Sequence, residues 1–241
     1  TRPDVHSMDE NEKSRRVRDM FGSIAKRYDF LNHFLSANLD RRWREACVRE
    51  IERRIPSPVP RILDVGCGTG DLSLSFSRLG PVVGCDFCHP MLQLAMRKVR
   101  EKSRRSVLLL EGDALALPFA DGTFDIVVSA FVLRNLADID GGLREMRRVL
   151  RPRGVMGFLE FGMPGGPLVS RLYRGYFLHL LPGIGKLISG VNGPYRYLPS
   201  SVQTFPAADQ LKKRVESAGF TDVECLLLTG GVAVLLTANA A

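Results

Sequence analysis

The residues best suited to chemistry lie in one short stretch, 61–71, which reads RILDVGCGTGD. An apolar run is followed by an acid, Asp64, then by Gly66, Gly68 and Gly70, and then by an apolar-periodic segment. This order predicts a buried strand, a tight loop and the start of a helix. Glycine lets the backbone approach a ligand closely, and the free N–H groups of a helix start favour an anionic group. We therefore expect a binding loop that can hold a carboxylate without a metal.

The spacing of the glycines and a second acid narrow the class of ligand. A dinucleotide fingerprint needs G-x-G-x-x-G, and this loop is one residue short of it, which counts against NAD. Asp86 ends the next apolar run, 82–85, where a carboxylate can accept hydrogen bonds from both ribose hydroxyls. The loop alone also fits an ordinary strand–turn–helix. With Asp86 it resembles motif I of the class I S-adenosylmethionine (SAM) methyltransferases, which implies SAM as the cofactor.

Three further candidates follow the ends of expected strands. Phe87 comes directly after Asp86 and can pack on an adenine face. After the third apolar run, Asp113 can accept a hydrogen bond from an adenine amino group, and the Ala114 backbone N–H can donate to a ring nitrogen. Ordinary loop chemistry explains each of them alone. Together they form a nucleoside-shaped set at the strand ends where open α/β sheets bind ligands.

The composition indicates one globular α/β chain. Its 241 residues are 45% hydrophobic and 25% charged, which is ordinary for a protein with a full core. We expect no membrane span, because no apolar run reaches roughly 18–20 residues, and residues 1–7 lack a signal-peptide core. Five scattered cysteines suit a reducing, cytoplasmic location, and we interpret the C-x-x-C of Cys85 and Cys88 as accidental. His and Cys are too scattered to predict a metal site.

The net charge is +8, and basic residues gather in two segments, 41–54 and 97–105. Solvated helix faces are the ordinary explanation of such segments. A nucleic acid partner and an anionic membrane surface are the two functional alternatives. Charge alone does not distinguish between them.

An N-terminal helical unit, 1–58, is expected to precede the main domain, 59–241. Apolar residues recur at helical spacing over 9–36, and a second helix follows before a Pro-rich hinge. Tyr28 and Asn32 lie one helical turn apart on one face. They can close over a ligand, although core packing explains Tyr28 equally well.

Strands and helices alternate from residue 61 onward, which predicts a parallel sheet. We expect strands near 61–65, 82–86, 107–111, 124–129, 154–161, 222–228 and 232–237. Helices are expected near 71–79, 90–102, 138–150 and 207–218. The short link Thr229-Gly230-Gly231 predicts that the last two strands are antiparallel neighbours. This α/β arrangement is similar to the Rossmann-like, seven-stranded, mostly parallel sheet of class I methyltransferases, with an antiparallel last strand.

A series of motifs occurs in the order seen in one family. It comprises Tyr28-Asp29 with Asn32, the glycine loop, Gly112-Asp113-Ala114, Leu133-Arg134-Asn135, Leu159-Glu160-Phe161, Tyr195-Arg196-Tyr197-Leu198-Pro199 and Leu228-Thr229-Gly230-Gly231. From about residue 17 to about residue 235, the chain resembles the ubiquinone/menaquinone biosynthesis C-methyltransferases, the UbiE/MenG family. The resemblance implies transfer of a methyl group from SAM to a ring carbon of a prenylated quinol.

The resemblance also assigns site residues, and the chain departs from the family at two points. Thr69, Asp86, Asp113 and Ala114 match positions that hold SAM. Ala130 stands where some members have a site serine, which removes one hydrogen bond. The C-terminal segment lacks the His-Arg that often follows the Gly-Gly motif.

The expected reaction makes its own demands on the site. A sulfonium methyl group is already activated, so orientation supplies much of the rate. A ring carbon becomes nucleophilic when an ortho hydroxyl loses its proton. Arg134 stays protonated and can stabilise the phenolate, and Asn135 can orient the hydroxyl. His179, Tyr195 and Glu160 are candidates for the base, although for His179 packing or an interface in its apolar segment is a strong alternative explanation.

The segment 162–206 is expected to be an insertion that forms a lid over the substrate. Its part 168–190 is apolar, and Pro182 and Gly183 break it into two pieces that cannot span a membrane. A wall for an isoprenoid tail near the membrane surface explains it as well as a buried helix pair or a dimer interface does. We therefore expect a cytoplasmic enzyme, peripheral at the inner face of the membrane, whose partner is a prenylated quinol and not a nucleic acid. A homodimer is one alternative.

Two other classes of function stay open. One is a SAM methyltransferase for another lipid, a small molecule or RNA, although no appended RNA-binding module is visible. The other is a non-catalytic SAM- or NAD-binding protein. The presence of both Asp86 and Asp113 counts against a protein that has lost its catalytic activity.

Overall fold

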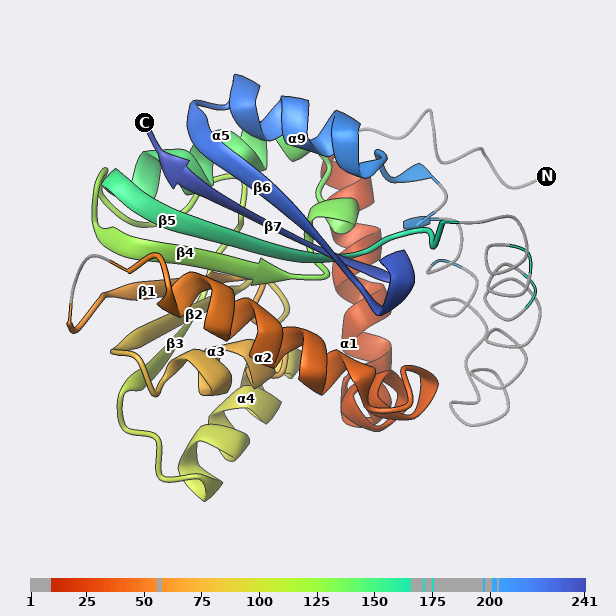
Figure 1. Ribbon diagram of the computed structural model, residues 1–241. Coiled ribbons are helices and arrows are strands. Elements are labelled where there is room, and N and C mark those ends of the chain that lie inside the picture. Colours follow the sequence, from red (N-terminus) through yellow and green to blue (C-terminus); the bar gives the residue numbers. More distant parts are fainter. Residues whose placement is uncertain are drawn as a thin grey trace.

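The computed structural model describes residues 10–55, 58–165, 171, 175, 197, 201–202 and 204–241. In this part of the chain, a twisted sheet lies between two layers of helices (Figure 1). The strands are β1 (Ile62–Val65), β2 (Val82–Asp86), β3 (Val107–Glu111), β4 (Phe124–Ala130), β5 (Leu150–Phe161), β6 (Phe220–Leu228) and β7 (Ala233–Ala240). Their order in the sheet is β3-β2-β1-β4-β5-β7-β6.

The pairing of the strands confirms the predicted seven-stranded sheet. β1 to β5 pair in parallel, and β7 runs antiparallel to both β5 and β6. The short turn η4 (Thr229–Gly231) joins β6 to β7, so the last two strands are antiparallel neighbours as predicted. β5 begins at Leu150, ahead of its expected start, because Leu150 pairs with Phe124 before an irregularity in the register.

The helices cover both faces of the sheet. α2 (Leu39–Glu52) and α3 (Asp71–Phe76) pack on one face, and α5 (Ile139–Val149) and α9 (Ala208–Ser217) pack on the other. Successive side chains of a strand point to opposite faces, so Ile62 enters the first of these cores and Leu63 the second. Strands that are buried on both faces are apolar along their whole length. The sequence therefore shows continuous runs of apolar residues instead of an alternation of apolar and polar residues.

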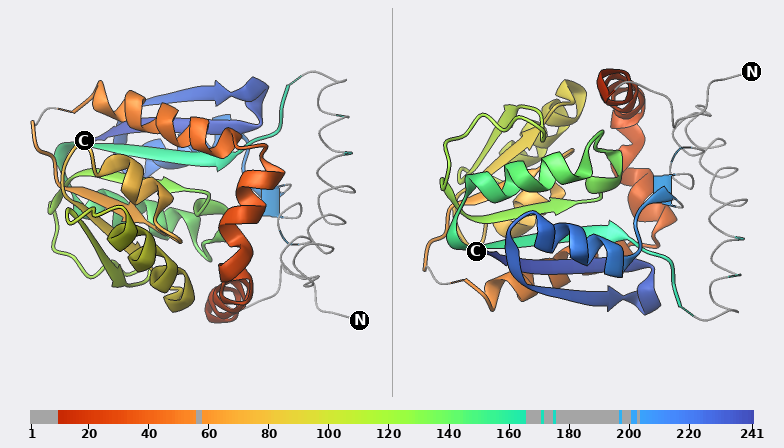
Figure 2. Two further views of the ribbon diagram at one scale, coloured as in Figure 1. Left: turned by 90° about the horizontal axis from the view of Figure 1, so that it is seen from below. Right: turned by 90° about the horizontal axis from the view of Figure 1, so that it is seen from above.

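α1 (Glu10–Leu35) lies outside both layers. It crosses the end of the sheet at which the parallel strands terminate, as both views in Figure 2 show. It also contacts α4 (His89–Glu101), the helix that follows β2. Because the loops after parallel strands gather at this edge, α1 is in position to cover a ligand site there.

Candidate active site

A cavity lies at this edge of the sheet, against α1. Its empty space, with the open mouth included, is about 720 Å³. Its walls come from the glycine loop, from α1 and from the residues that follow β2, β3 and β4. The predicted site residues that line it are Tyr28, Gly66, Gly68, Asp86, Phe87, Asp113, Ala114 and Asn135.

The glycine loop is shaped by residues with positive φ. Gly66 and Gly70 have φ values of 68° and 82°, a region in which a Cβ is costly. A Cβ on Gly66 would also lie 2.4 Å from a methyl group of Val132. The Gly66 N–H donates to the carbonyl oxygen of Cys85 at 2.7 Å, which fixes the loop to the end of β2. The cavity is therefore bounded here by bare backbone.

Asp86 is held at the end of β2 by backbone groups. Its Oδ2 accepts from the Gly68 N–H and its Oδ1 from the Cys88 N–H, each at 2.8 Å. Burial raises the pKa of this carboxyl, whereas the two N–H groups lower it. Each oxygen keeps a second lone pair that can accept from a hydroxyl group of a ligand.

The two other residues predicted to recognise adenine through their side chains also line the cavity. Asp113 accepts the Leu115 N–H through Oδ1 at 2.9 Å, which fixes its carboxylate in a tight turn. Phe87 carries the guanidinium of Arg18, from α1, at 5.2 Å from its ring centroid. Arg18 occupies one face of that ring, and the other face can pack on a flat ligand.

The outer wall of the cavity contains three α1 residues that the sequence analysis did not single out, Ser14, Val17 and Phe21. With Tyr28 they share one face of the helix. The helical periodicity of 9–36 could have identified this face, but not what it covers. Lys13 fastens this half of α1 by donating to the carbonyl oxygen of Leu136, and burial lowers the pKa of Lys13.

Thr69, a predicted SAM-binding residue, lies behind the loop and is not on the cavity wall. Its hydroxyl donates to Asp29 of α1 at 2.5 Å and accepts from Lys98 of α4 at 3.1 Å. Lys98 Nζ also lies 2.6 Å from a carboxylate oxygen of Asp29 and 2.6 Å from one of Asp71. These contacts join α1, α4 and the glycine loop, so Thr69 positions the loop in this structure.

Asp64, also predicted to bind the cofactor, lies beneath the loop and away from the cavity wall. It is 1% exposed, and its Oδ2 accepts from the Ser73 hydroxyl at 2.5 Å. Burial raises the pKa of Asp64 to about 7; the Ser73 hydroxyl opposes this rise and the Asp86 carboxylate adds to it. Asp64 thus supports the strand–loop–helix from within the core.

Arg134, the residue predicted to stabilise a phenolate, forms a buried ion pair with Glu160. Its Nη1 lies 2.8 Å from Glu160 Oε2, and the two side chains are 6% and 2% exposed. Arg134 belongs to the short helix η2 (Leu133–Asn135) after β4, and Glu160 lies at the end of β5, so two adjacent strands bring them together. Burial raises the pKa of the Glu160 carboxyl, and the charge of Arg134 lowers it.

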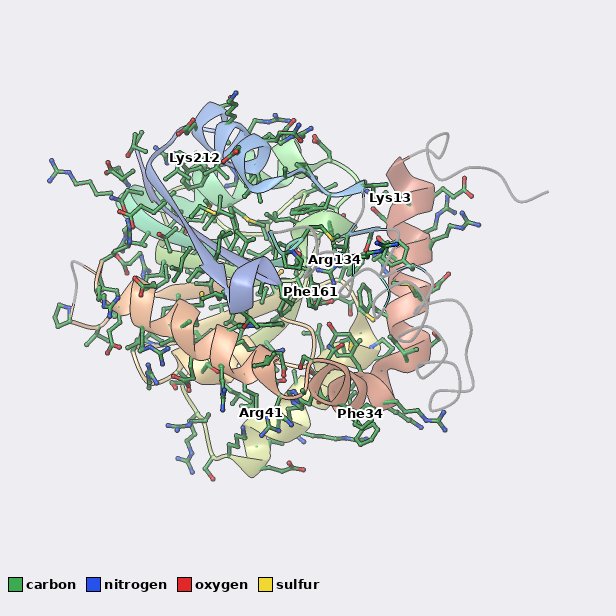
Figure 3. The ribbon with its side chains drawn as sticks, turned by 45° about the vertical axis from the view of Figure 1, so that its right-hand side comes forward. Lys13, Phe34, Arg41, Arg134, Phe161 and Lys212 are labelled. Atoms are coloured by element: carbon green, nitrogen blue, oxygen red, sulfur yellow. The ribbon has the colours of Figure 1, made fainter. Side chains whose placement is uncertain are left out.

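Aromatic rings surround this pair. Arg134 Cζ lies 5.8 Å from the ring centroid of Phe131 and 5.2 Å from that of Phe161. Figure 3 shows Arg134 and Phe161 side by side between α1 and the β6–β7 hairpin. Phe131 also lines the cavity, with a φ of 62° that is uncommon for a residue other than glycine. Neither Arg134 nor Glu160 lines the cavity; the pair lies behind the ring of Phe131.

Tyr195, His179 and most of the insertion 162–206 lie outside the described residues. Tyr197, in the same motif as Tyr195, is described. Burial raises the pKa of Tyr197 and the nearby Arg134 charge lowers it. The motif holds a second tyrosine two positions after Tyr195, and this repeat could have identified Tyr197 from the sequence.

In the described part of the chain, no group of three or more His, Cys, Asp or Glu side chains could hold a metal ion. None of the described helices combines the length and the apolar character that crossing a bilayer requires.

The fold is similar to that of a SAM-dependent methyltransferase from Aquifex aeolicus. The identity is 18% and the TM-score 0.59, over 80% of this chain and 89% of that one. At this identity the likeness concerns the fold alone.

Two sequence relatives are much more similar. The demethylmenaquinone methyltransferase of Thermus thermophilus is 48% identical over 219 residues, which cover 90% of this chain and 97% of the relative. The ubiquinone/menaquinone biosynthesis C-methyltransferase UbiE of Geobacter sulfurreducens is 44% identical over 231 residues, which cover 94% and 89%. The model of the ubiE/COQ5 methyltransferase family matches residues 8–239. This chain therefore belongs to the ubiE/COQ5 methyltransferase family, whose cofactor is SAM.

Proposed function

We propose that this protein transfers a methyl group from SAM to a ring carbon of a prenylated quinol, the activity that the names of its relatives indicate. The observation that carries the proposal is the composition of one cavity. Its walls include both Asp86 and Asp113, which suit a nucleoside, and Asn135, which is next to the buried Arg134–Glu160 pair. The proposal therefore puts a nucleoside and an ionisable ring hydroxyl in this one cavity.

We assign SAM to the part of the cavity that the glycine loop bounds. Asp86 accepts from the ribose hydroxyls, Asp113 accepts from the adenine amino group, and the Ala114 N–H donates to a ring nitrogen. Phe87 packs on the base. The close approach that this requires fits Gly66, where a Cβ would collide with a neighbouring side chain. When bound, SAM supplies a methyl group already activated by the positive charge on sulfur.

Arg134 and Asn135 are assigned to the quinol. A buried cation stabilises a developing phenolate strongly because the surroundings have a low effective dielectric constant. Asn135 Nδ2 donates to the Phe131 carbonyl oxygen at 2.9 Å, which fixes the amide. Its Oδ1 is buried without a partner and can accept the quinol hydroxyl. Tyr195 and His179 stay predictions, as does the role of 162–206 as a lid.

The N-terminal unit, 1–58, is assigned the role of a cap. α1 supplies the outer wall of the cavity, and α2 attaches the unit to the sheet. The Trp43 indole N–H donates to the hydroxyl of Thr229 at 2.8 Å, and Trp43, Cys47 and Ile51 are buried against the strands.

We further propose peripheral contact with an anionic membrane at its cytoplasmic face, where a prenylated quinol would be met. Phe30 and Phe34 on α1 are 59% and 53% exposed, and their rings stack 5.8 Å apart. Exposed aromatic side chains can enter the lipid headgroup region. Arg41 and Arg42, at the start of α2, are also exposed, and Figure 3 shows Arg41 at the same end of the molecule as Phe34. Basic side chains at such a surface attract anionic lipids.

A homodimer is proposed on a separate observation. β6 is an edge strand of the sheet, and it exposes Leu226 and Leu227 by 44% and 60%. An exposed apolar edge strand can pair with a second copy. Light scattering that gives only the mass of one chain would contradict this proposal.

The test of the proposed activity is incubation of the purified protein with labelled SAM and demethylmenaquinol, with a demethylated benzoquinol and bulk RNA as competitors. We expect label in the extracted quinol, and its distribution between the two quinols identifies the preferred ring. Label in the RNA, or no label in either quinol, would overturn the proposal.

A further inference from the structure

The Arg134–Glu160 pair has unused hydrogen-bonding capacity. Three side-chain atoms in this region are buried without a partner: Arg134 Nε, Asn135 Oδ1 and Glu160 Oε1. Among the described residues, only Asp64 has another such atom. Buried polar atoms are almost always paired in folded proteins. One free donor and two free acceptors around a single ion pair therefore point to a ligand that both donates and accepts hydrogen bonds.

The pair is connected to the cavity through three residues that line it. Asn135 follows Arg134 in the chain, and the Phe131 ring lies under the Arg134 guanidinium at 5.8 Å. Tyr28 is close enough that the Arg134 charge lowers its pKa, against the rise that burial causes. Arg134 and Glu160 lie behind these residues and do not line the cavity themselves. Glu160 is the carboxylate behind this wall, and its Oε1 has no hydrogen-bond partner.

We propose that Glu160 is the general base of the methyl transfer, and that Arg134 exchanges the Glu160 carboxylate for the phenolate of the substrate. The proposal rests on the proposed function. It explains how an arginine that is already neutralised by a carboxylate can stabilise a second anion. Before proton transfer, the site holds a guanidinium, a carboxylate and a neutral hydroxyl. Afterwards it holds a guanidinium, a neutral carboxylic acid and a phenolate, with the same total charge.

In the proposed step the hydroxyl O–H bond breaks, its proton goes to Glu160 Oε1, and its electron pair delocalises onto the ortho ring carbon. That carbon forms the new C–C bond to the methyl group, while the electron pair of the S–C bond stays on sulfur. The ring carbon then loses its hydrogen as a proton to solvent, which restores the aromatic ring, and Glu160 returns its proton to the phenolate oxygen.

The surroundings of Glu160 favour this exchange. The titratable groups that face the pair from the described elements are Arg134 itself, Tyr197 and, on the Arg134 side, Tyr28. Neither tyrosine carries a charge in its ordinary state, so among the described residues Arg134 is the cation that acts on this carboxylate. Burial disfavours the charged form of Glu160, which makes protonation easier once Arg134 turns to the phenolate.

The first test measures binding without turnover. The probe is the 4-nitro-1-naphtholate anion, and calorimetry in buffers of different ionisation enthalpy reports protons taken up on binding. We expect the native protein to take up a proton with each bound anion, because Glu160 must be neutralised to release Arg134. Glu160→Gln should bind the anion at least as tightly with no uptake, and Glu160→Asp should keep the uptake. Native binding without uptake, or uptake retained in Glu160→Gln, would overturn the proposal.

The second test is single-turnover methylation of demethylmenaquinol at saturating SAM over a range of pH. Glu160→Gln should lower the rate by on the order of 10²-fold, as for loss of a general base, and the rate should recover as pH rises and the quinol ionises in solution. SAM affinity should not change. Asp125→Asn is the matched control, because Asp125 pairs with Arg151 at 2.5 Å at the other end of the strands.

These outcomes separate the two proposals. A native protein that methylates no quinol contradicts the proposed function. A native protein that is active while Glu160→Gln is equally fast at every pH contradicts only the role of Glu160.

Discussion

Lys98 on α4 and Asp29 on α1 form an ion pair across the back of the glycine loop, with Nζ and Oδ2 2.6 Å apart. Thr69 of the loop bonds to both partners. The side chains of Lys98 and Asp29 are only 21% and 29% exposed, so solvent screens the pair partially. Because α1 also forms the outer wall of the cavity, this pair joins that wall to the glycine loop.

Lys98→Met should therefore weaken SAM binding by about tenfold, since it removes a partly exposed charge-assisted contact. Hydrogen exchange should show faster exchange in α1 and unchanged exchange in β4 and β5. Lys102→Met, an exposed lysine at the end of the same helix, serves as the control. Equal SAM affinity in the two variants would mean that the pair does not hold the cap.

Asp86→Ala should weaken SAM binding by roughly 1.5–3 kcal/mol, the range of a charge-assisted hydrogen bond. The variant loses the acceptor for the ribose hydroxyls and also frees the N–H groups of Gly68 and Cys88. Asp86→Asn keeps one acceptor oxygen and should fall between the native protein and Asp86→Ala. Calorimetric titration with SAM measures all three, and an unchanged affinity in Asp86→Ala would remove this assignment.

Asp64 should make folding stability depend on pH. Burial raises its folded-state pKa to about 7, from an ordinary value of 3.8, so the folded protein holds this proton more tightly than the unfolded chain does. The resulting penalty is absent below about pH 4, grows as pH rises, and is complete above about pH 7. Asp64→Asn removes the charge, so its free energy of unfolding relative to the native protein should rise by a few kcal/mol across this window.

Urea unfolding of both proteins at the two ends of the window, in the absence of SAM, measures this difference. A difference between native protein and Asp64→Asn that stays the same at both pH values would show that Asp64 is ionised in the folded state throughout.

Arg134→Ala should lower kcat by on the order of 10²-fold or more, as for loss of an oxyanion donor. The phenolate exists only on the way to methyl transfer, so the arginine stabilises the transition state more than the ground state. Arg134→Lys keeps the charge without the planar fork and should fall between the two. SAM affinity should hardly change, and single-turnover methylation with SAM saturating is the measurement.

Removal of Arg134 also leaves the buried Glu160 carboxylate without its partner, which lowers stability as well as activity. Rates should therefore be compared per folded molecule. If Arg134→Ala then transfers methyl groups at the native rate, the arginine serves only to pair Glu160.

Replacement of both Phe30 and Phe34 by serine should reduce binding to anionic vesicles by about tenfold or more, because the exposed aromatic pair is lost. Added salt should weaken the binding of the native protein by screening its basic side chains. Leu108→Ser is the control, since Leu108 is 66% exposed on the edge strand β3. Cosedimentation with phosphatidylglycerol and phosphatidylcholine vesicles measures these effects, and equal binding to both lipids would contradict the proposed surface.

The sequence by itself determined those parts of the candidate site that depend only on the order of residues within a short segment. Apolar runs placed the strands, glycines placed the loop, and Asp86 and Asp113 lie at strand ends that any parallel sheet gathers at one edge. The register of β2 beside β3 sets Asp86 opposite Glu111.

Only the tertiary structure decided which polar side chains meet. Arg134 pairs with Glu160, 26 positions further along the chain. Thr69 bonds to Asp29, which is 40 positions away, and to Lys98, which is 29 positions away. The periodicity of a segment reports which face is apolar, but not which other segment covers it. The packing of α1, α3 and α4 holds the side chains of Thr69 and Asp64 behind the glycine loop, and their role as cofactor ligands stays a prediction. Glu160 looked like one base candidate among several, until the adjacency of β4 and β5 placed it against Arg134.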